Sequence, residues 1–139
     1  MKKFLEYVKE NVDLDKQLLN ASKNDDLEKV KELISKGADI ETKDNDDYTP
    51  LNIASYKGHL EIVKYLVEQG ADIESKDNDG DTPLDCEKDN IWSRLDVQEL
   101  LMEQDPMNIS LLKKHDIPIH PELKNKYPSE VIGSDFGSI

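Results

Sequence analysis

Apolar residues recur at helical spacing in the middle of the chain. Leu60, Val63 and Leu66 follow one another at steps of three, so they fall on one face of a helix. Gly70 comes after this run, and a glycine often ends a helix because it adopts the left-handed conformation freely. The pattern predicts a helix over 60–69.

A shorter helix is predicted just before this one. Thr49 is a favourable N-cap, and Pro50 suits the first helical position, where its missing N–H has no intrahelical partner to lose. The helix should run to about Tyr56, because Gly58 follows. One helix pair of this size cannot bury its apolar face alone, so further pairs should stack on it.

Such pairs are present, because the chain repeats itself with a period of 33 residues. The sequence Gly-Ala-Asp-Ile-Glu at 37–41 recurs at 70–74. When 18–43 is aligned with 51–76 at this offset, 14 of 26 positions are identical. The chain is therefore built from copies of one helix-pair unit.

The period and the sequence Thr-Pro-Leu-Asn-Ile-Ala at 49–54 resemble the ankyrin repeat, a family with a 33-residue period and a Thr-Pro-Leu-His-x-Ala signature. Asn52 and Asp85 stand where this family usually has histidine. Asp47 stands where Gly80 stands one repeat later. Because aspartate tolerates the left-handed conformation better than most residues, we expect the turn at Asp47 to survive.

The resemblance covers about residues 18–104 and implies an all-α ankyrin-repeat solenoid of about three helix-pair repeats. The first repeat lacks the Thr-Pro start, and its helices are expected over 14–23 and 27–36. The second helix of the third repeat aligns only if two residues are inserted near 89–93. We expect an altered loop there that holds Trp92.

The two ends differ from the repeats. Apolar residues at helical spacing in 1–16 predict an N-terminal capping helix, because an end repeat exposes an apolar flank; an amphipathic helix that docks on a partner is the alternative. Residues 105–139 form a proline-rich tail in which long helices are excluded, although a short capping helix is expected over 107–115. The tail beyond either wraps the last repeat or stays mobile. The predicted domains are 1–104 and 105–139.

The formal net charge of −13 adds information about partners. Residues 1–104 hold 26 acidic and 14 basic residues, whereas 105–139 hold 5 and 4, so the charge belongs to the repeats. Nucleic acids and anionic membranes would repel such a chain, and a protein with a basic surface would be attracted to it. The alternative is that acidity only keeps the protein in solution. We expect a monomer that binds neither nucleic acid nor membrane.

The single cysteine, Cys86, allows no disulfide within the chain, which indicates a reducing compartment. Charged residues interrupt the apolar start of the sequence too early for a signal peptide. The expected location is therefore cytoplasmic.

No motif for catalysis or cofactor binding stands out in the sequence. Asp77, Asp79 and Asp81 alternate as in a calcium loop, but Thr82 follows where the loop requires glycine, and Lys88 stands where it requires glutamate. We interpret the alternation as a solvated connector between repeats. No metal, cofactor or enzymatic activity is expected.

The resemblance implies partner binding through the connector tips and the exposed sides of the first helices, which together line a concave face. Aromatic side chains mark binding hot spots better than charged ones, so Tyr48, Tyr56 and Trp92 are the expected anchors. Ordinary packing is the alternative for all three, and above all for Trp92. The expected contact residues are Asn45, Asp46, Tyr48, Tyr56, Lys57, Asn78, Asp79, Asp81, Asp89 and Trp92.

Together these features predict a non-catalytic interaction module that binds a basic partner protein through an acidic concave face. The alternative is a dedicated inhibitor or immunity protein that neutralises one basic toxin or nuclease-like enzyme, a role that a small acidic binder would suit. An enzyme is the remote third possibility.

Overall fold

The computed structural model describes the backbone of residues 4–85 and 88–126 and the side chains of residues 13–85 and 91–126. The elements in order are α1 (Phe4–Lys23), α2 (Leu27–Ser35), α3 (Pro50–Lys57), α4 (Leu60–Glu68), the short 3₁₀ helices η1 (Pro83–Asp85) and η2 (Lys88–Ser93), α5 (Leu95–Gln104), α6 (Asn108–Lys114) and α7 (Pro121–Lys126). The described residues contain no strand. None of their helices is both long enough and apolar enough to cross a bilayer.

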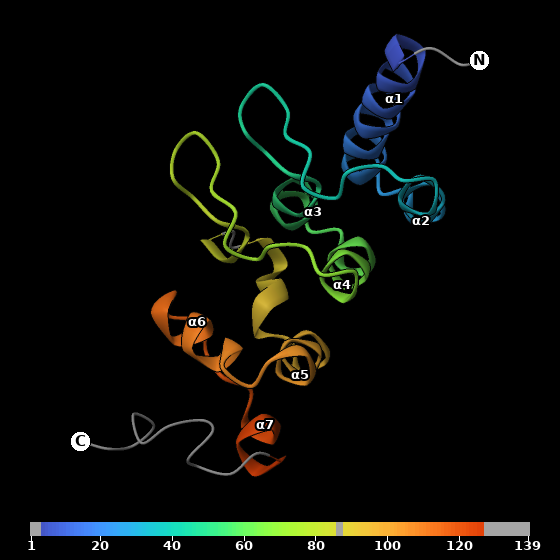
Figure 1. The fold of residues 1–139 in the computed structure, drawn as a ribbon. Coiled ribbons are helices and arrows are strands. Elements are labelled where there is room, and N and C mark those ends of the chain that lie inside the picture. Colours follow the sequence, from blue (N-terminus) through green and yellow to red (C-terminus); the bar gives the residue numbers. More distant parts are fainter. Residues whose placement is uncertain (1–3, 86–87, 127–139) are drawn as a thin grey trace. The chain divides into compact units, whose positions relative to one another are not determined.

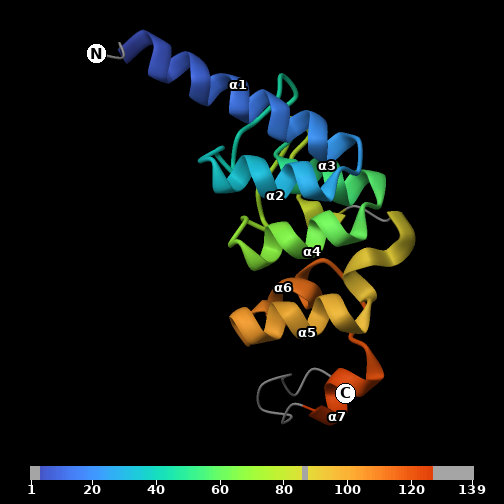
Figure 2. The same ribbon diagram turned by 90° about the vertical axis from the view of Figure 1, so that its right-hand side faces the viewer.

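The chain divides into two compact units, residues 1–88 and 89–139. The first unit contains two antiparallel helix pairs, α1 with α2 and α3 with α4. Helix α1 packs against α3, and α2 packs against α4 (Figures 1 and 2), so the first helices and the second helices form two rows. The fully buried side chains between them include Leu18, Val30, Leu33, Leu51, Ile62, Val63 and Leu66.

The central helix pair begins and ends as the sequence predicts. The Thr49 hydroxyl accepts a hydrogen bond from the Asn52 backbone N–H, and the Asn52 side chain accepts one from the Thr49 N–H, which makes a capping box ahead of Pro50. Gly58 ends α3 in the left-handed conformation, with φ 77°. These local signals fix a short α3 and turn the chain directly into α4.

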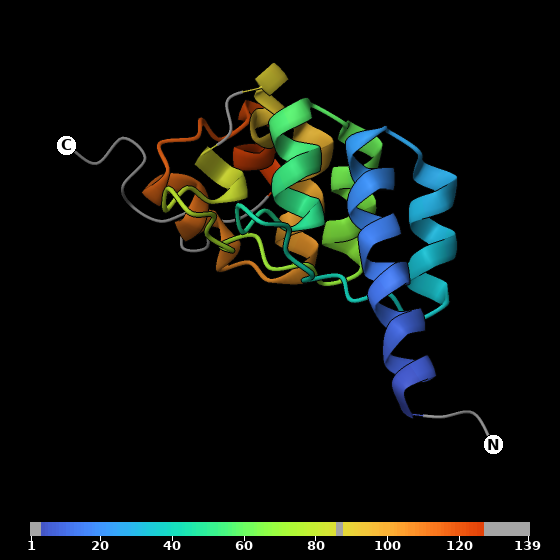
Figure 3. The same cartoon turned by 90° about the horizontal axis from the view of Figure 1, so that it is seen from above.

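The N-terminal segment differs from the prediction. A capping helix over 1–16 and a separate repeat helix over 14–23 were expected, but α1 is one continuous helix of 20 residues. Its N-terminal turns extend past α2 in Figure 3. Residues 13–17 contain neither glycine nor proline, so nothing in their chemistry stops the helix between the two predicted segments.

Polar contacts lie within the first repeat and between the first repeat and the second. The Asp39 N–H donates to the Asp15 carboxylate at 2.7 Å, and the Asp72 N–H donates to the Glu41 carboxylate at 2.8 Å. His59 places Nε2 at 3.1 Å from the Lys23 carbonyl oxygen. All three satisfy backbone groups at helix and connector ends, and the last two also hold the two repeats in register.

In the second unit, a buried glutamine joins separate segments. Gln98 on α5 donates to the carbonyl oxygens of Trp92, at 2.9 Å, and Pro118, at 2.8 Å, and its own carbonyl oxygen accepts the His120 N–H. The predicted helix over 107–115 is confirmed as α6, and Pro121 starts the short α7. The predicted boundary after residue 104 stays a prediction, because compactness alone does not define a domain.

The altered region of the third repeat is confirmed, but the expectation that Trp92 is a binding anchor is wrong. The expected insertion falls in η2, where six residues form a 3₁₀ helix. Trp92 is only 2% exposed. Its large apolar ring is buried and does not lie on the surface of a loop. Ordinary packing, the alternative reading, therefore holds for this residue.

Candidate functional site

The first connector, between α2 and α3, ends in a tight turn held by one aspartate. The Asp44 carboxylate accepts hydrogen bonds from the backbone N–H groups of Asp46, at 2.9 Å, and Tyr48, at 3.0 Å. Asp47 takes a positive φ of 63° at the turn, as expected for an aspartate in a glycine position. This turn fixes where Asp46 and Tyr48 stand.

The second connector, between α4 and η1, repeats this turn 33 residues later. The Asp77 carboxylate accepts from the N–H groups of Asp79, at 2.8 Å, and Asp81, at 3.0 Å, and Gly80 takes the position equivalent to Asp47 with φ 81°. The two connectors thus share one backbone design, and this explains why aspartate recurs at these positions.

The two connectors are also bonded to each other. The Asn78 N–H donates to the Asp46 carbonyl oxygen at 3.1 Å, and the Lys43 ammonium group donates to the Lys76 carbonyl oxygen at 3.3 Å. Both loops project on the same side of the helices of the first unit (Figure 1). They therefore form one wall beside the row of first helices.

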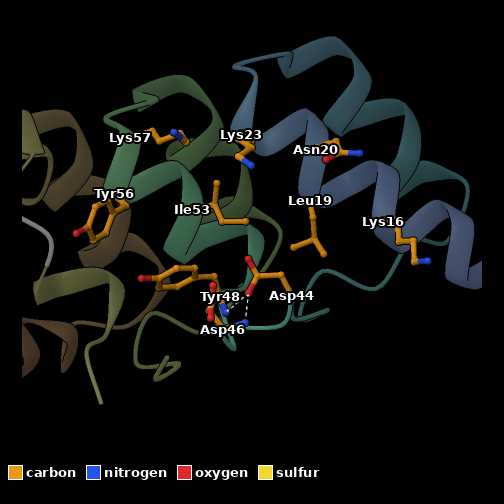
Figure 4. A pocket seen from close by; sticks show the side chains of 10 residues that line it. All are labelled: Lys16, Leu19, Asn20, Lys23, Asp44, Asp46, Tyr48, Ile53, Tyr56 and Lys57. Carbon is orange, nitrogen blue, oxygen red and sulfur yellow. Dashed lines mark hydrogen bonds between the residues drawn. The ribbon is translucent and has the colours of Figure 1, made fainter. Parts of the chain in front are cut away.

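A groove of about 560 Å³ lies between this wall and the first helices (Figure 4). The residues that α1 contributes are spaced three or four apart, so they lie on one face of that helix, and the residues from α3 likewise lie on one face. The lining residues are Lys16, Leu19, Asn20 and Lys23 from α1, Ile53, Tyr56 and Lys57 from α3, and Asp44, Asp46 and Tyr48 from the connector.

Two tyrosines meet at one end of the groove. Their ring centroids lie 6.2 Å apart with a tilt of 46°, within the range of favourable aromatic pairs. Tyr56 is 65% exposed, whereas Tyr48 is half-buried. Burial, followed by the carboxylate of Asp77, raises the pKa of Tyr48 above its ordinary value, so its hydroxyl stays protonated and able to donate a hydrogen bond.

Charges of opposite sign occupy opposite sides of the groove. Lys16, Lys23 and Lys57 lie along the helices, while Asp44 and Asp46 lie along the connector (Figure 4). An acidic concave face was expected, but this groove carries mixed charge, so the expectation is wrong for the groove. The sequence-level prediction failed here because the acidic excess is placed on connectors, where aspartate is needed for turns, and the helix surface carries lysine.

A cluster of carboxylates lies on the second connector. Asp77, Asp79 and Asp81 can bring one oxygen each within 4.8 Å of the others, a spacing at which a metal ion could be held. Asp81 is exposed, but partial desolvation of its carboxylate, followed by the charges of Asp77, Asp85 and Asp79, raises its pKa. One Asp77 oxygen accepts hydrogen bonds from two backbone N–H groups of the turn, so the turn by itself accounts for the closeness of these carboxylates. The absence of a metal site stays a prediction.

The structure places the expected contact residues in different surroundings. Asp46, Tyr48, Tyr56 and Lys57 line the groove together. The remaining connector residues, Asn45, Asn78, Asp79 and Asp81, are exposed beside it. The side chain of Asp89 and the whole of Cys86 lie outside the described residues, and the burial of Trp92 removes it from any surface.

Sequence reasoning missed most of the α1 side of the groove. Lys16, Leu19 and Asn20 were absent from the expected contact set, as were Asp44 and Ile53. The available signal was the 33-residue offset, since Asn20 is the counterpart of Ile53 and Lys23 of Tyr56. Because the first repeat lacks the Thr-Pro start, the sequence did not indicate that α1 belongs to the row of first helices along this length.

Comparison with known proteins agrees with this architecture. A family model for ankyrin repeats, described as three copies, matches residues 18–112, which is more than half of the chain. The match passes the end that the sequence indicated, residue 104, and reaches α6. No curated protein gives a significant match.

Proposed function

The chain belongs to the ankyrin-repeat family, whose repeats generally act as protein–protein interaction modules, and from this premise we propose that it binds a partner protein through the groove of its first two repeats. The family is typically non-catalytic, and binding requires none of the chemistry that an active site would have to supply. We further propose that it does so as a monomer in the cytoplasm.

The exposed tyrosine in the groove is the single observation that carries this proposal. Tyr56 is one of two large hydrophobic side chains exposed among the described residues. It lies on a helix with a second tyrosine beside it, in a concavity lined by polar groups. Tyrosines in such places provide rigid contact area and a hydrogen-bonding hydroxyl, and they are enriched among residues that dominate binding energy.

The connector carboxylates support a partner with a basic surface next to the groove. Asp46, Asp79 and Asp81 are exposed, and the chain as a whole carries a formal charge of −13. Such a field steers a basic protein towards the connectors and speeds its encounter, an effect that salt weakens. Exposed charge pairs add little affinity, so the tyrosines supply the energy that retains the partner.

The same charge distribution favours a narrower role as a second candidate. A small acidic protein with one binding groove would suit a dedicated inhibitor or immunity protein that neutralises one basic toxin or nuclease-like enzyme. A general adaptor would be recovered with partners of varied charge, whereas an inhibitor would be recovered with a single basic enzyme whose activity it abolishes.

Affinity isolation with matched variants tests the proposal. The wild-type chain, Tyr56→Ala and Tyr65→Ala should be used in parallel on extracts of the source cell, followed by mass spectrometry. Tyr65 lies on α4, with the Lys31 ammonium group 5.6 Å from its ring centre, and does not line the groove. A protein recovered with the wild type and Tyr65→Ala but lost with Tyr56→Ala supports the groove. Equal recovery with all three contradicts it.

A further inference from the structure

We propose that the groove selects a partner segment of mixed charge, with an acidic side chain facing the α1 and α3 lysines, an apolar side chain between the helices, and a basic side chain facing Asp46 and the tyrosines. This inference rests on the proposed function and adds the chemistry and the direction of the bound segment. It differs from the attraction of a uniformly basic surface to the connectors.

The floor of the groove accepts an apolar side chain. Leu19 and Ile53 are half-buried and lie between the charged sides in Figure 4. Leu19 projects from α1 and Ile53 from α3, so an apolar residue set between these helices would contact both and remove their remaining exposed surface from water. A volume of about 560 Å³ suits a few side chains of one short segment.

The lysines on the helical side have no acidic partner among the side chains that the structure describes. Lys16, Lys23 and Lys57 are exposed, and no ion pair to them is found within the described side chains of residues 13–85 and 91–126. Two other lysines of the same unit, Lys29 and Lys36, differ because both pair with Glu32 on α2. The groove therefore presents three cations whose charge is left for an external carboxylate.

The connector side presents the opposite chemistry. The Asp44 carboxylate is already used by two backbone N–H groups, whereas the Asp46 side chain makes no hydrogen bond or ion pair within those same described side chains. Tyr56 and Tyr48 stand beside it. An arginine or lysine could meet the Asp46 carboxylate and a tyrosine face together, since cations are attracted to both.

Because the lysines and the aspartates lie on opposite sides of the groove, the bound segment can lie in only one orientation, with its acidic side chain toward the helices and its basic side chain toward the connector. A uniformly acidic segment would face Asp44 and Asp46 at one side, and a uniformly basic one would face three lysines at the other, so each would meet like charge. Only a segment with both signs in the correct order avoids repulsion at both sides. The mixed groove thus discriminates by repulsion as well as by attraction.

Selection of short random peptides, displayed on phage and panned on the full-length chain, tests this inference. Enriched peptides should carry an acidic and a basic residue on either side of an apolar one, in a constant order. Enrichment of peptides with a single sign of charge, of peptides without charge, or of none at all would overturn the inference.

Charge reversal then links the enriched peptide to the groove. In fluorescence anisotropy, the Lys23→Glu/Lys57→Glu variant should bind a synthetic copy of that peptide at least about tenfold more weakly, because like charges then face each other. Replacing the peptide's acidic residue by lysine should restore binding to this variant. The Lys29→Glu/Lys36→Glu variant, changed on α2, is the matched control and should bind as the wild type does.

The Tyr56→Ala variant separates this inference from the proposed function. If that variant loses the peptide while Lys23→Glu/Lys57→Glu keeps it, the groove binds but does not select by charge, and the inference fails alone. If neither variant changes binding, the groove is not the site and both fail. The melting temperature of each variant should equal that of the wild type, which would show that a loss of binding does not come from a loss of fold.

Discussion

Asn52 stands at the position where the repeat signature has histidine, and its side chain performs a structural task there. It accepts hydrogen bonds from the Thr49 N–H, at 2.9 Å, and from the Thr49 hydroxyl, at 2.8 Å, and donates to the Ser75 carbonyl oxygen at 3.2 Å. A short polar side chain thus caps α3 and holds the second connector. Asp85 accepts from Thr82 in the same way one repeat later.

Replacing Asn52 by alanine should destabilise the fold. The change leaves the buried Thr49 N–H and the Ser75 carbonyl oxygen without this partner, and an unsatisfied buried polar group costs about 1–3 kcal/mol. Chemical denaturation should show a loss of that size for Asn52→Ala. Asn45→Ala, at an exposed connector position, should stay within about 0.5 kcal/mol of the wild type. Equal effects of the two changes would contradict the capping role.

At the level of elements, α1 is the clearest departure from the expected organisation. A single helix over Phe4–Lys23 would be broken by proline at Asp13, which is exposed in its middle. Proline there removes one intrahelical hydrogen bond and clashes with the preceding turn, at a cost of about 3 kcal/mol or more. Calorimetry and far-ultraviolet dichroism of Asp13→Pro should show lower stability and lost helicity, while Asp13→Ala should show neither. Tolerance of proline would mean two separate helices.

The second connector should make stability depend on pH. The pKa of Asp81 is raised from its ordinary value of 3.8, first by partial desolvation of the carboxylate and then by the charges of Asp77, Asp85 and Asp79. The folded protein therefore binds a proton at Asp81 more readily than the unfolded chain, so this residue disfavours folding at pH values above its folded-state pKa, and the penalty is relieved as pH falls through that pKa to below 3.8.

Asp81→Asn removes this charge and is expected to raise the denaturation midpoint at pH 7. The gain should shrink as the pH is lowered and disappear below 3.8. Asp13→Asn on α1 is the matched control for the loss of one charge. A gain for Asp81→Asn that is the same at every pH would show that the charge of the Asp81 carboxylate is not its cause.

The sequence predicted those elements whose limits are set by local chemistry. Thr49 and Gly58 bound α3 because a cap and a left-handed glycine act within a few residues. The continuity of α1 was missed although residues 13–17 contain no helix-breaking residue. The burial of Trp92 could not be predicted in this way, because it is not decided by its neighbours in the chain. Lys57 was among the expected contact residues, but Lys16 was not, because this side of the groove exists only where α1 packs against α3.

For the whole molecule, the distribution of charge and aromatic surface predicts two separable kinetic effects. Asp79→Lys should chiefly slow association with the partner, because it weakens a long-range attraction worth roughly 10- to 1000-fold in rate. Tyr56→Ala should chiefly speed dissociation, because it removes contact area. Surface plasmon resonance at low and high salt separates the two rates. Association independent of salt, with neither variant affected, would place the contact elsewhere, such as on the proline-rich tail.

Site-specific photocrosslinking tests most directly whether the groove of the first two repeats holds the partner. A benzophenone amino acid placed at Tyr56 lies in the groove, whereas the same group at Glu61, an exposed position on α4, lies outside it. On illumination in the source cell, we predict a crosslinked partner at position 56 that is absent at position 61. The same partner at both positions, or at position 61 alone, would contradict the account.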